Sequence, residues 1–155
     1  MNIFERIEQE IHDRGAQLDV VDFGSKRIKG LYVDGSIALN KDLCNNAERT
    51  CVAAEELAHH ELTVGNILNM HDIQNRKQEY TSRLAAYNKL IGLYGIISGY
   101  KARCRNRFEL ATHLEVTEDF LQDALNCYHS KYGPMAQIDN YIIFFEPGIA
   151  VLERF

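Results

Sequence analysis

Apolar and polar positions alternate along the chain with two different periods. Isoleucines spaced four residues apart from Ile3 to Ile11 predict a first helix that ends at Gly15. The next run, KRIKGLYVDGSIALNKDL, places Asp34-Gly35 between two β-prone stretches. Both residues tolerate positive φ, so this run predicts a β-hairpin.

Longer helical patterns occupy the middle of the chain. From about Ala47 to Thr63 no Gly or Pro interrupts the helical pattern, and Gly65 and Asn66 then end it. A second long helix is expected from about Ile73 to Ile91. Three glycines weaken the following stretch, which predicts a shorter helix.

The C-terminal part predicts two more helices and a closing hairpin. The run RFELATHLEVTEDFLQDALNCYHSKYG is typical of helix, turn and helix, with Thr117 as N-cap and Gly133 as stop. NYIIFFEPGIAVLERF predicts a hairpin that turns at Pro147-Gly148. The whole order indicates an α+β fold. We expect one mostly helical domain over residues 1–155, with a small antiparallel sheet from the N-terminal hairpin and a C-terminal β-hairpin.

Composition narrows the class of protein. A chain of 155 residues with 46% hydrophobic residues can bury a core without disulfides. The net charge of −5 argues against a nucleic-acid surface spread over the molecule and against binding to anionic membranes. The four cysteines form no C-x-x-C pair, which indicates reduced thiols. The N-terminus lacks the hydrophobic run of a signal peptide, and no apolar stretch reaches membrane-spanning length. We therefore expect a cytoplasmic location.

The run CVAAEELAHHELTVGNIL sets two glutamates one helical turn before two histidines. On a helix with 100° per residue, Glu55 and His59 lie one above the other and border the apolar face. Glu56 and His60 form a second pair of this kind, further from that face. Two ligands one turn apart, beside a carboxylate that can move a proton, are what a metal-dependent hydrolase needs.

The spacing matches the zinc-protease motif H-E-x-x-H, except that Glu55 replaces the first histidine. In this pattern Glu55 and His59 are metal ligands and Glu56 is the general base. If the helix is rotated, His60 and Glu56 coordinate instead. An acid and a histidine four residues apart also occur as a simple stabilising pair on a solvated face, so this helix alone leaves both interpretations open.

A third ligand is expected on the second long helix. Glu79 begins a stripe of small and apolar positions that continues to Leu90, and such a stripe predicts an inward face. A carboxylate on that face needs a partner, because burying it unpaired costs several kcal/mol. A metal ion held by Glu55, His59 and Glu79 supplies one.

Other residues compete for these roles. Glu79 can instead form a salt bridge with Arg76 or Arg83, and His71 is a competing ligand in the loop between the two helices. A further side chain that stabilises the oxyanion is also expected. The candidates for it are Tyr80, His60 and His71.

Taken together, these segments resemble the ImmA/IrrE metallopeptidases. AAEELAHHELTVGNIL resembles the active-site helix of the subgroup common in Gram-positive bacteria and their phages. RKQEYTSRLAAYNKLI is similar to the family's second helix, whose third-ligand glutamate falls on Glu79. IKGLYVDGSIALNKDL resembles the preceding hairpin, and RCRNRFELATHLEVTEDFLQDALNCYHSKYG the helical segment that follows. The resemblance covers nearly the whole chain.

The resemblance implies a zincin-like fold and a cytosolic metallo-endopeptidase whose protein substrate is a helix-turn-helix repressor of a phage or mobile element. Glu55 stands where the family often has histidine. Two carboxylate ligands weaken the Lewis acidity of zinc, and this harder ligand set also suits manganese or iron. The alternative is a catalytically inactive module of the same fold that binds metal or a repressor.

The segment FELATHLEVTEDFLQDAL also has the look of a DNA-binding helix-turn-helix. However, the second helix of that pair begins with three acids, Glu118, Asp119 and Asp123, which repel phosphates. Basic residues between Lys101 and Arg107 offer some compensation. We therefore expect this segment to be a packing unit and do not expect DNA binding.

Overall fold

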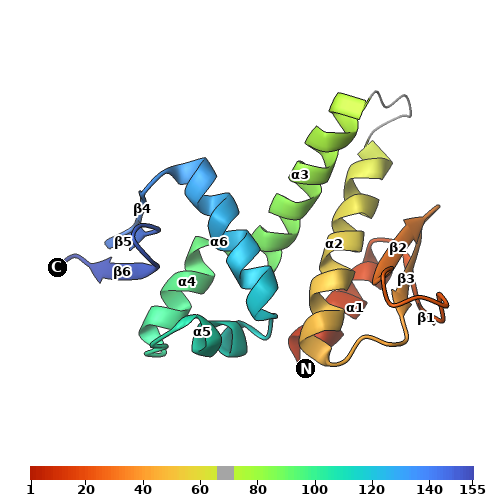
Figure 1. The fold of residues 1–155 in the computed structure, drawn as a ribbon, viewed down its shortest axis with the longest axis horizontal. Helices are drawn as coiled ribbons and strands as arrows, with labels where there is room; N and C mark the ends of the chain where they lie inside the picture. Colours follow the sequence, from red (N-terminus) through yellow and green to blue (C-terminus); the bar gives the residue numbers. More distant parts are fainter. Residues whose placement is uncertain (66–71) are drawn as a thin grey trace. The chain divides into compact units, whose positions relative to one another are not determined.

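The computed structural model describes residues 1–65 and 72–155 and has the α+β fold expected from the sequence (Figure 1). Contacts divide the chain into two compact units, Met1–Ala86 and Tyr87–Phe155. Each unit is described separately. The expectation of one domain over residues 1–155 stays a prediction.

The N-terminal unit holds a small sheet and three helices. Its elements are α1 (Ile3–Asp13), β1 (Gln17–Val21), β2 (Gly30–Val33), β3 (Ser36–Asn40), α2 (Asn46–Gly65) and most of α3 (Asp72–Leu90). Figure 1 shows α2 with the sheet on one side and α3 on the other. The residues of greatest chemical interest therefore lie on the central helix of this unit.

Helix α1 follows the sequence prediction closely. The Asn2 side chain accepts a hydrogen bond from the backbone N–H of Glu5 at 2.8 Å, and the Glu5 carboxylate accepts one from the Asn2 backbone N–H at 3.0 Å. This capping box satisfies two donors that the first turn would otherwise leave unpaired. Ile7 and Ile11 are buried, and Gly15 follows the helix with a φ of +79°. The first helix and its stop are confirmed.

The predicted hairpin is confirmed, but it belongs to a larger sheet. β2 and β3 pair antiparallel, with Asp34 (φ 48°) and Gly35 (φ 80°) in the turn between them. A strand that the sequence did not predict, β1, pairs parallel with β3, so the sheet is mixed and has the order β1-β3-β2. Most β1 side chains are exposed. This strand therefore lacks the alternating apolar positions by which a half-buried strand is recognised.

β2 packs very closely on α2. A Cβ placed on Gly30 would lie 2.5 Å from Val52 Cγ1 and 3.3 Å from Glu56 Cγ. Only glycine permits this approach of strand backbone to helix side chain. The backbone of β2 consequently lies against the side chain of Glu56.

Gly30→Ala is expected to destabilise the protein by about 1–3 kcal/mol, because Val52 and the strand must move apart to admit the methyl group. Gly148→Ala is the matched control, since a Cβ there meets open space. Urea denaturation of both variants measures the difference. Equal stability of the two variants would contradict the close packing of β2 on α2.

Helices α2 and α3 begin and end within two residues of the predicted bounds. α2 buries small and apolar side chains, including Ala54, Leu57 and Ala58, all with no exposed surface. Ser82 and Ala86 of α3 are also buried, as the stripe that begins at Glu79 predicted. The Glu79 side chain itself keeps 46% of its surface exposed, so the expectation that this carboxylate lies on a buried face was wrong.

The C-terminal unit also contains three helices and a sheet. Its elements are α4 (Gly92–Lys101), α5 (Arg107–Leu114), α6 (Glu118–Tyr132), β4 (Met135–Ile138), β5 (Tyr141–Phe144) and β6 (Ala150–Glu153). Thr117 caps α6 by accepting a hydrogen bond from the Phe120 N–H at 3.1 Å, and Gly133 ends it with a φ of +80°. Both the cap and the stop are as predicted.

The C-terminal hairpin is present as part of an antiparallel sheet with the order β4-β5-β6. Pro147-Gly148 lies in the connection between β5 and β6, as expected. β4 was not predicted. It joins β5 through a two-residue turn in which Asp139 has a φ of +52°, and Asp-Asn is a less distinctive hairpin signal than Asp-Gly.

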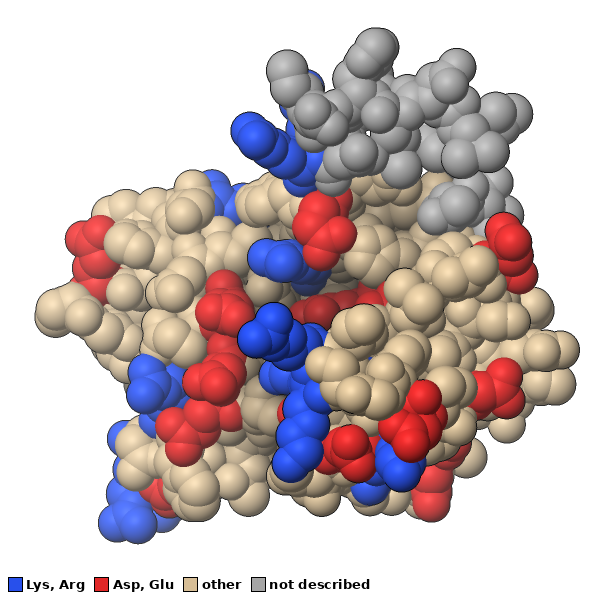
Figure 2. All heavy atoms as spheres, turned by 45° about the vertical axis from the view of Figure 1, so that its right-hand side comes forward, with Lys and Arg blue, Asp and Glu red and all other residues tan. Residues whose placement is uncertain are grey.

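In the described part of the chain, no helix combines the length and apolar character needed to cross a bilayer. On the face drawn in Figure 2, Lys and Arg side chains lie interspersed with Asp and Glu side chains. In the segment that resembles a helix-turn-helix, Arg107 contacts Glu118 at 3.6 Å and Arg105 contacts Glu109 at 3.3 Å. Neighbouring acids thus offset these two basic charges.

Candidate metal centre

His59 of α2 and Glu79 of α3 meet directly. The Nε2 atom of His59 lies 3.3 Å from Oε2 of Glu79, and the side chains keep 26% and 46% of their surface exposed. The other carboxylate oxygen of Glu79 lies 3.2 Å from Nε of Arg83. The structure therefore unites two of the three predicted ligands, and it also contains the salt bridge that the sequence left as the alternative for Glu79.

The geometry of this pair fits a zinc ion. With ligand distances of about 2.0–2.2 Å, two donors at adjacent corners of a tetrahedron lie roughly 3.4 Å apart. The 3.3 Å between His59 Nε2 and Glu79 Oε2 is close to that separation. The same distance also suits a long N–H···O contact, so this pair can exist without an ion.

Glu55 does not complete a cluster with these two residues. It is half-buried on α2, four residues before His59. Within residues 1–65 and 72–155, no three His, Cys, Asp or Glu side chains gather closely enough to hold a metal ion together. The predicted role of Glu55 as a ligand stays a prediction.

Glu56 has the most perturbed carboxyl group of the candidate site. Burial, the largest cause, together with the charges of Glu55 and Glu79, raises the pKa of Glu56 to about 7. Its Cγ atom lies near the backbone of Gly30, which helps to exclude water on that side. A carboxyl whose pKa lies near neutrality can both accept and return a proton, as a general base requires.

His60 faces the sheet and α1, contrary to the expectation that it lies far from the buried face. It is only 7% exposed, its Nε2 lies 3.1 Å from the carbonyl oxygen of Arg14, and its Nδ1 lies 2.8 Å from the Tyr32 hydroxyl. The carbonyl can only accept, so Nε2 carries the proton and the Tyr32 hydroxyl donates to Nδ1 of the neutral ring. Gly35 N–H donates to the same hydroxyl at 3.1 Å.

These contacts engage both ring nitrogens of His60 in holding α1, α2 and the β2–β3 turn together. A ligand role for His60 would first require one of them to break. Sequence reasoning missed Tyr32. The apolar residues of β2, Leu31 and Val33, lie on its exposed face, so no pattern in the sequence indicated that Tyr32 faces His60, 28 residues later.

Three candidates named from the sequence remain: His71, Tyr80 and Arg76. His71 lies outside the described residues. Tyr80 is 50% exposed on α3, and Arg76 is also exposed. Tyr80 as an oxyanion-stabilising residue stays a prediction.

No family model matches the chain, and neither a curated protein nor a solved structure matches it. The chemistry of the candidate site therefore has to be inferred from its own side chains.

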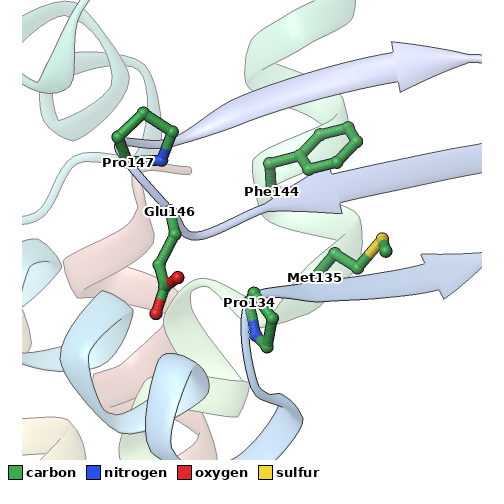
Figure 3. Close-up of a pocket in the computed structure, with 5 residues that line it drawn as sticks. All are labelled: Pro134, Met135, Phe144, Glu146 and Pro147. Carbon is green, nitrogen blue, oxygen red and sulfur yellow. The ribbon is translucent and has the colours of Figure 1, made fainter.

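A hollow with a volume of about 520 Å³ lies in the C-terminal unit, away from these residues in the sequence. Figure 3 shows its lining, in which Met135 and Phe144 form a cross-strand pair. Pro134 directly precedes β4, and Pro147 lies in the connection between β5 and β6. The one charged side chain of this lining, Glu146, contacts His129 of α6. This hollow is largely apolar, and among the described residues no third histidine, cysteine or carboxylate joins the His129–Glu146 pair in a group that could hold a metal ion.

The raised pKa of Glu56 makes a prediction for the metal-free protein. Between pH 4.5 and about 7 the folded protein keeps the Glu56 proton while the unfolded chain has released it. The free energy of unfolding therefore falls as pH rises through this window and remains lowered above it. Glu56→Gln removes the ionisation and is expected to stabilise the protein above pH 7 by on the order of 2 kcal/mol, a value discounted for partial exposure.

Urea denaturation at a series of pH values measures this effect. The stability difference between Glu56→Gln and the wild type is expected to be smallest near pH 4.5 and to grow toward pH 7. Glu8→Gln, at an exposed site on α1, is the control and is expected to show a difference that does not change with pH. A pH-independent difference for Glu56→Gln as well would contradict the proposed environment of this carboxyl.

Proposed function

We propose that the protein is a metal-dependent endopeptidase whose ion is held by His59, Glu79 and Glu55, with Glu56 as general base. The observation that carries the proposal is the convergence of His59 Nε2 and Glu79 Oε2, 3.3 Å apart, next to a carboxyl whose pKa is raised to about 7. A pair of possible ligands beside a carboxyl group with a perturbed pKa is the arrangement by which a candidate active site is recognised.

The ion, when bound, supplies Lewis acidity toward a water molecule and a peptide carbonyl. Glu56 takes the proton of the attacking water and then delivers it to the nitrogen of the leaving amine. Its partial burial and the neighbouring negative charges favour uptake of that proton. Breaking the C–N bond yields one carboxylate and one amine.

The sheet supplies a place for an extended substrate. β2 lies at the edge of the β1-β3-β2 order, so one side of its backbone is unpaired within the sheet. The side chains of Leu31 and Val33 are about half exposed on this strand. A peptide that pairs with the free edge of β2 runs beside Gly30, and Gly30 lies against Glu56. The peptide backbone is thereby brought to the proton-transfer group.

The class of metal and substrate follows from the same residues. Two carboxylates and one imidazole neutralise a divalent ion and suit zinc, with manganese or iron as alternatives. We propose a protein substrate, a helix-turn-helix repressor of a phage or mobile element, as the resemblance to ImmA/IrrE metallopeptidases implies. We place the protein in the cytoplasm, a location supported by four cysteines that all remain free thiols.

Metal-dependent cleavage tests this function. The purified protein is stripped with a chelator, reloaded with zinc, manganese or iron(II), and incubated with a repressor encoded beside its gene and with a peptide library read by mass spectrometry. Cleavage that is absent in the stripped protein and returns with one of the metals is the expected result. Cleavage that does not depend on metal, or none with any of the metals, contradicts the proposal.

A binding module that holds metal without hydrolysis is the second candidate. The observation that favours it is that Glu55 stands where the zinc-protease motif has histidine, since two carboxylate ligands would weaken the Lewis acidity of the ion. Stoichiometric metal with no cleavage of any library peptide, combined with binding to a repressor, would support this module over the peptidase.

A further inference from the structure

Ser82 lies beside the histidine of the candidate site. Its Oγ is 3.2 Å from Nδ1 of His59, and the serine is 1% exposed. Ser82 follows Glu79 by three residues on α3, about one helical turn. The same helix therefore contacts both nitrogens of the His59 ring: Glu79 lies at Nε2 and Ser82 at Nδ1.

Proton positions on this ring must change when a metal binds. In the metal-free neutral ring, the carboxylate of Glu79 can only accept, so Nε2 carries the proton and Nδ1 accepts from the Ser82 hydroxyl. When Nε2 is a ligand it has no proton, and Nδ1–H becomes a donor. A hydroxyl both donates and accepts, so Ser82 can bond Nδ1 in either tautomer.

We propose that Ser82 is the positioning residue of His59: its hydroxyl fixes the plane of the imidazole by bonding Nδ1, and it can keep that bond when Nδ1 carries the proton and Nε2 binds the metal. This inference rests on the proposed metal site and deepens it. Metal-ligating histidines are commonly held in this way by a hydrogen bond to the second ring nitrogen. Here the hydroxyl comes from the helix that also carries Glu79, so the two ligands are oriented together.

Ser82, His59 and Glu79 also have the residue types of a Ser-His-acid catalytic triad. A nucleophilic serine must reach the substrate, whereas Ser82 is 1% exposed between α2 and α3. The contacts are also reversed, because Ser82 lies at Nδ1 and Glu79 at Nε2. Burial and ring orientation therefore favour the positioning role.

The test compares Ser82→Ala with Thr81→Ala. Thr81 is the matched control because its hydroxyl donates within α3, to the Lys77 carbonyl at 2.8 Å, and its side chain is exposed. Zinc affinity is measured by competition with a chromophoric chelator. In the same samples, ¹⁵N chemical shifts of the His59 ring report its tautomer at mildly alkaline pH, before and after zinc is added.

Ser82→Ala is expected to weaken zinc binding by about 10–100-fold, the range found when such supporting hydrogen bonds are removed. Because the hydroxyl that donates to Nδ1 is lost, the fraction of the Nε2–H tautomer in its metal-free His59 ring is expected to be lower than in the wild type. Thr81→Ala is expected to match the wild type in both measurements, and circular dichroism checks that both variants are folded.

The outcomes separate the two proposals. If the wild type binds zinc through His59 while Ser82→Ala keeps the same affinity and tautomer, the positioning role is wrong and the metal site stands. If the wild type binds no metal at His59, the metal site and the role of Ser82 toward it are both wrong. If Ser82→Ala is unfolded, the zinc-bound wild type decides: a His59 ring that binds zinc through Nε2 and carries its proton on Nδ1 supports the positioning role. A ring that binds zinc through Nδ1 overturns it, because Nδ1 is then not available to Ser82.

Discussion

Replacing His59 with alanine is expected to weaken zinc binding by more than about 100-fold. The imidazole is the one nitrogen donor of the proposed site, and its Nε2 lies 3.3 Å from the Glu79 carboxylate. Without it, Glu79 keeps its contact to Arg83 at 3.2 Å, and an arginine-paired carboxylate is a weak metal ligand. Loss of a direct ligand should exceed the 10–100-fold cost of losing a supporting residue.

Competition with a chromophoric chelator measures this change, and His12→Ala is the matched control. His12 is an exposed histidine on α1, so its removal tests for adventitious zinc on surface imidazoles. Glu79→Ala should reproduce the loss seen for His59→Ala. Unchanged zinc affinity in Glu79→Ala would instead identify Glu79 as the salt-bridge partner of Arg83 alone.

Glu56→Gln is expected to lower the rate of peptide cleavage by about 10²–10⁴-fold while zinc content stays near that of the wild type. Glutamine keeps the shape of the side chain but cannot accept a proton from the attacking water. The group it replaces has a pKa of about 7, near the value at which a base both accepts and returns protons efficiently. The loss should therefore appear in kcat rather than in metal binding.

Glu61→Gln is the control for this prediction, because Glu61 lies on the same helix and pairs with Arg14 at 3.6 Å, outside the candidate site. It should cleave like the wild type. Elemental analysis of all three proteins separates loss of the base from loss of metal. Full activity of Glu56→Gln would show that another group activates the water.

Local signals decided which parts of the fold the sequence could predict. Asp34-Gly35 fixed the β2–β3 hairpin because both residues adopt the positive φ that such a turn requires. Thr117 and Gly133 bounded α6 for equally local reasons. By contrast, β1 is held by a parallel partner some 19 residues later in the chain, and its exposed side chains carry no alternation. No short segment of the sequence carries a signal for pairing between strands so far apart in the chain.

The positions of the candidate site residues were likewise predictable only where a local pattern determines them. The i, i+4 spacing of α2 and the inward stripe of α3 predicted that His59 and Glu79 face each other, and the structure brings them together. The helical-wheel projection of α2 predicted the wrong position for His60 because it assumes that the helix has one buried face. Here the sheet covers a second face, where Tyr32 and Arg14 engage both nitrogens of His60.

The least predictable feature is the position of Glu55. The wheel placed it beside the apolar face with His59, but the conformation of a glutamate side chain depends on tertiary neighbours and on any bound ion. The sequence therefore predicted Glu55 as a metal ligand. In the described residues, however, Glu55 does not form a three-residue metal-binding group with His59 and Glu79. A bound metal ion would bring the Glu55 carboxylate toward His59 and Glu79.

Crystals grown with zinc and measured on both sides of the zinc absorption edge test the central claim most directly. We expect an anomalous peak at about 2.0–2.2 Å from His59 Nε2 and from a carboxylate oxygen of Glu79, with Glu55 as a further ligand. Zinc at other histidines only, with Glu79 still paired to Arg83 and no peak at His59, would contradict the account.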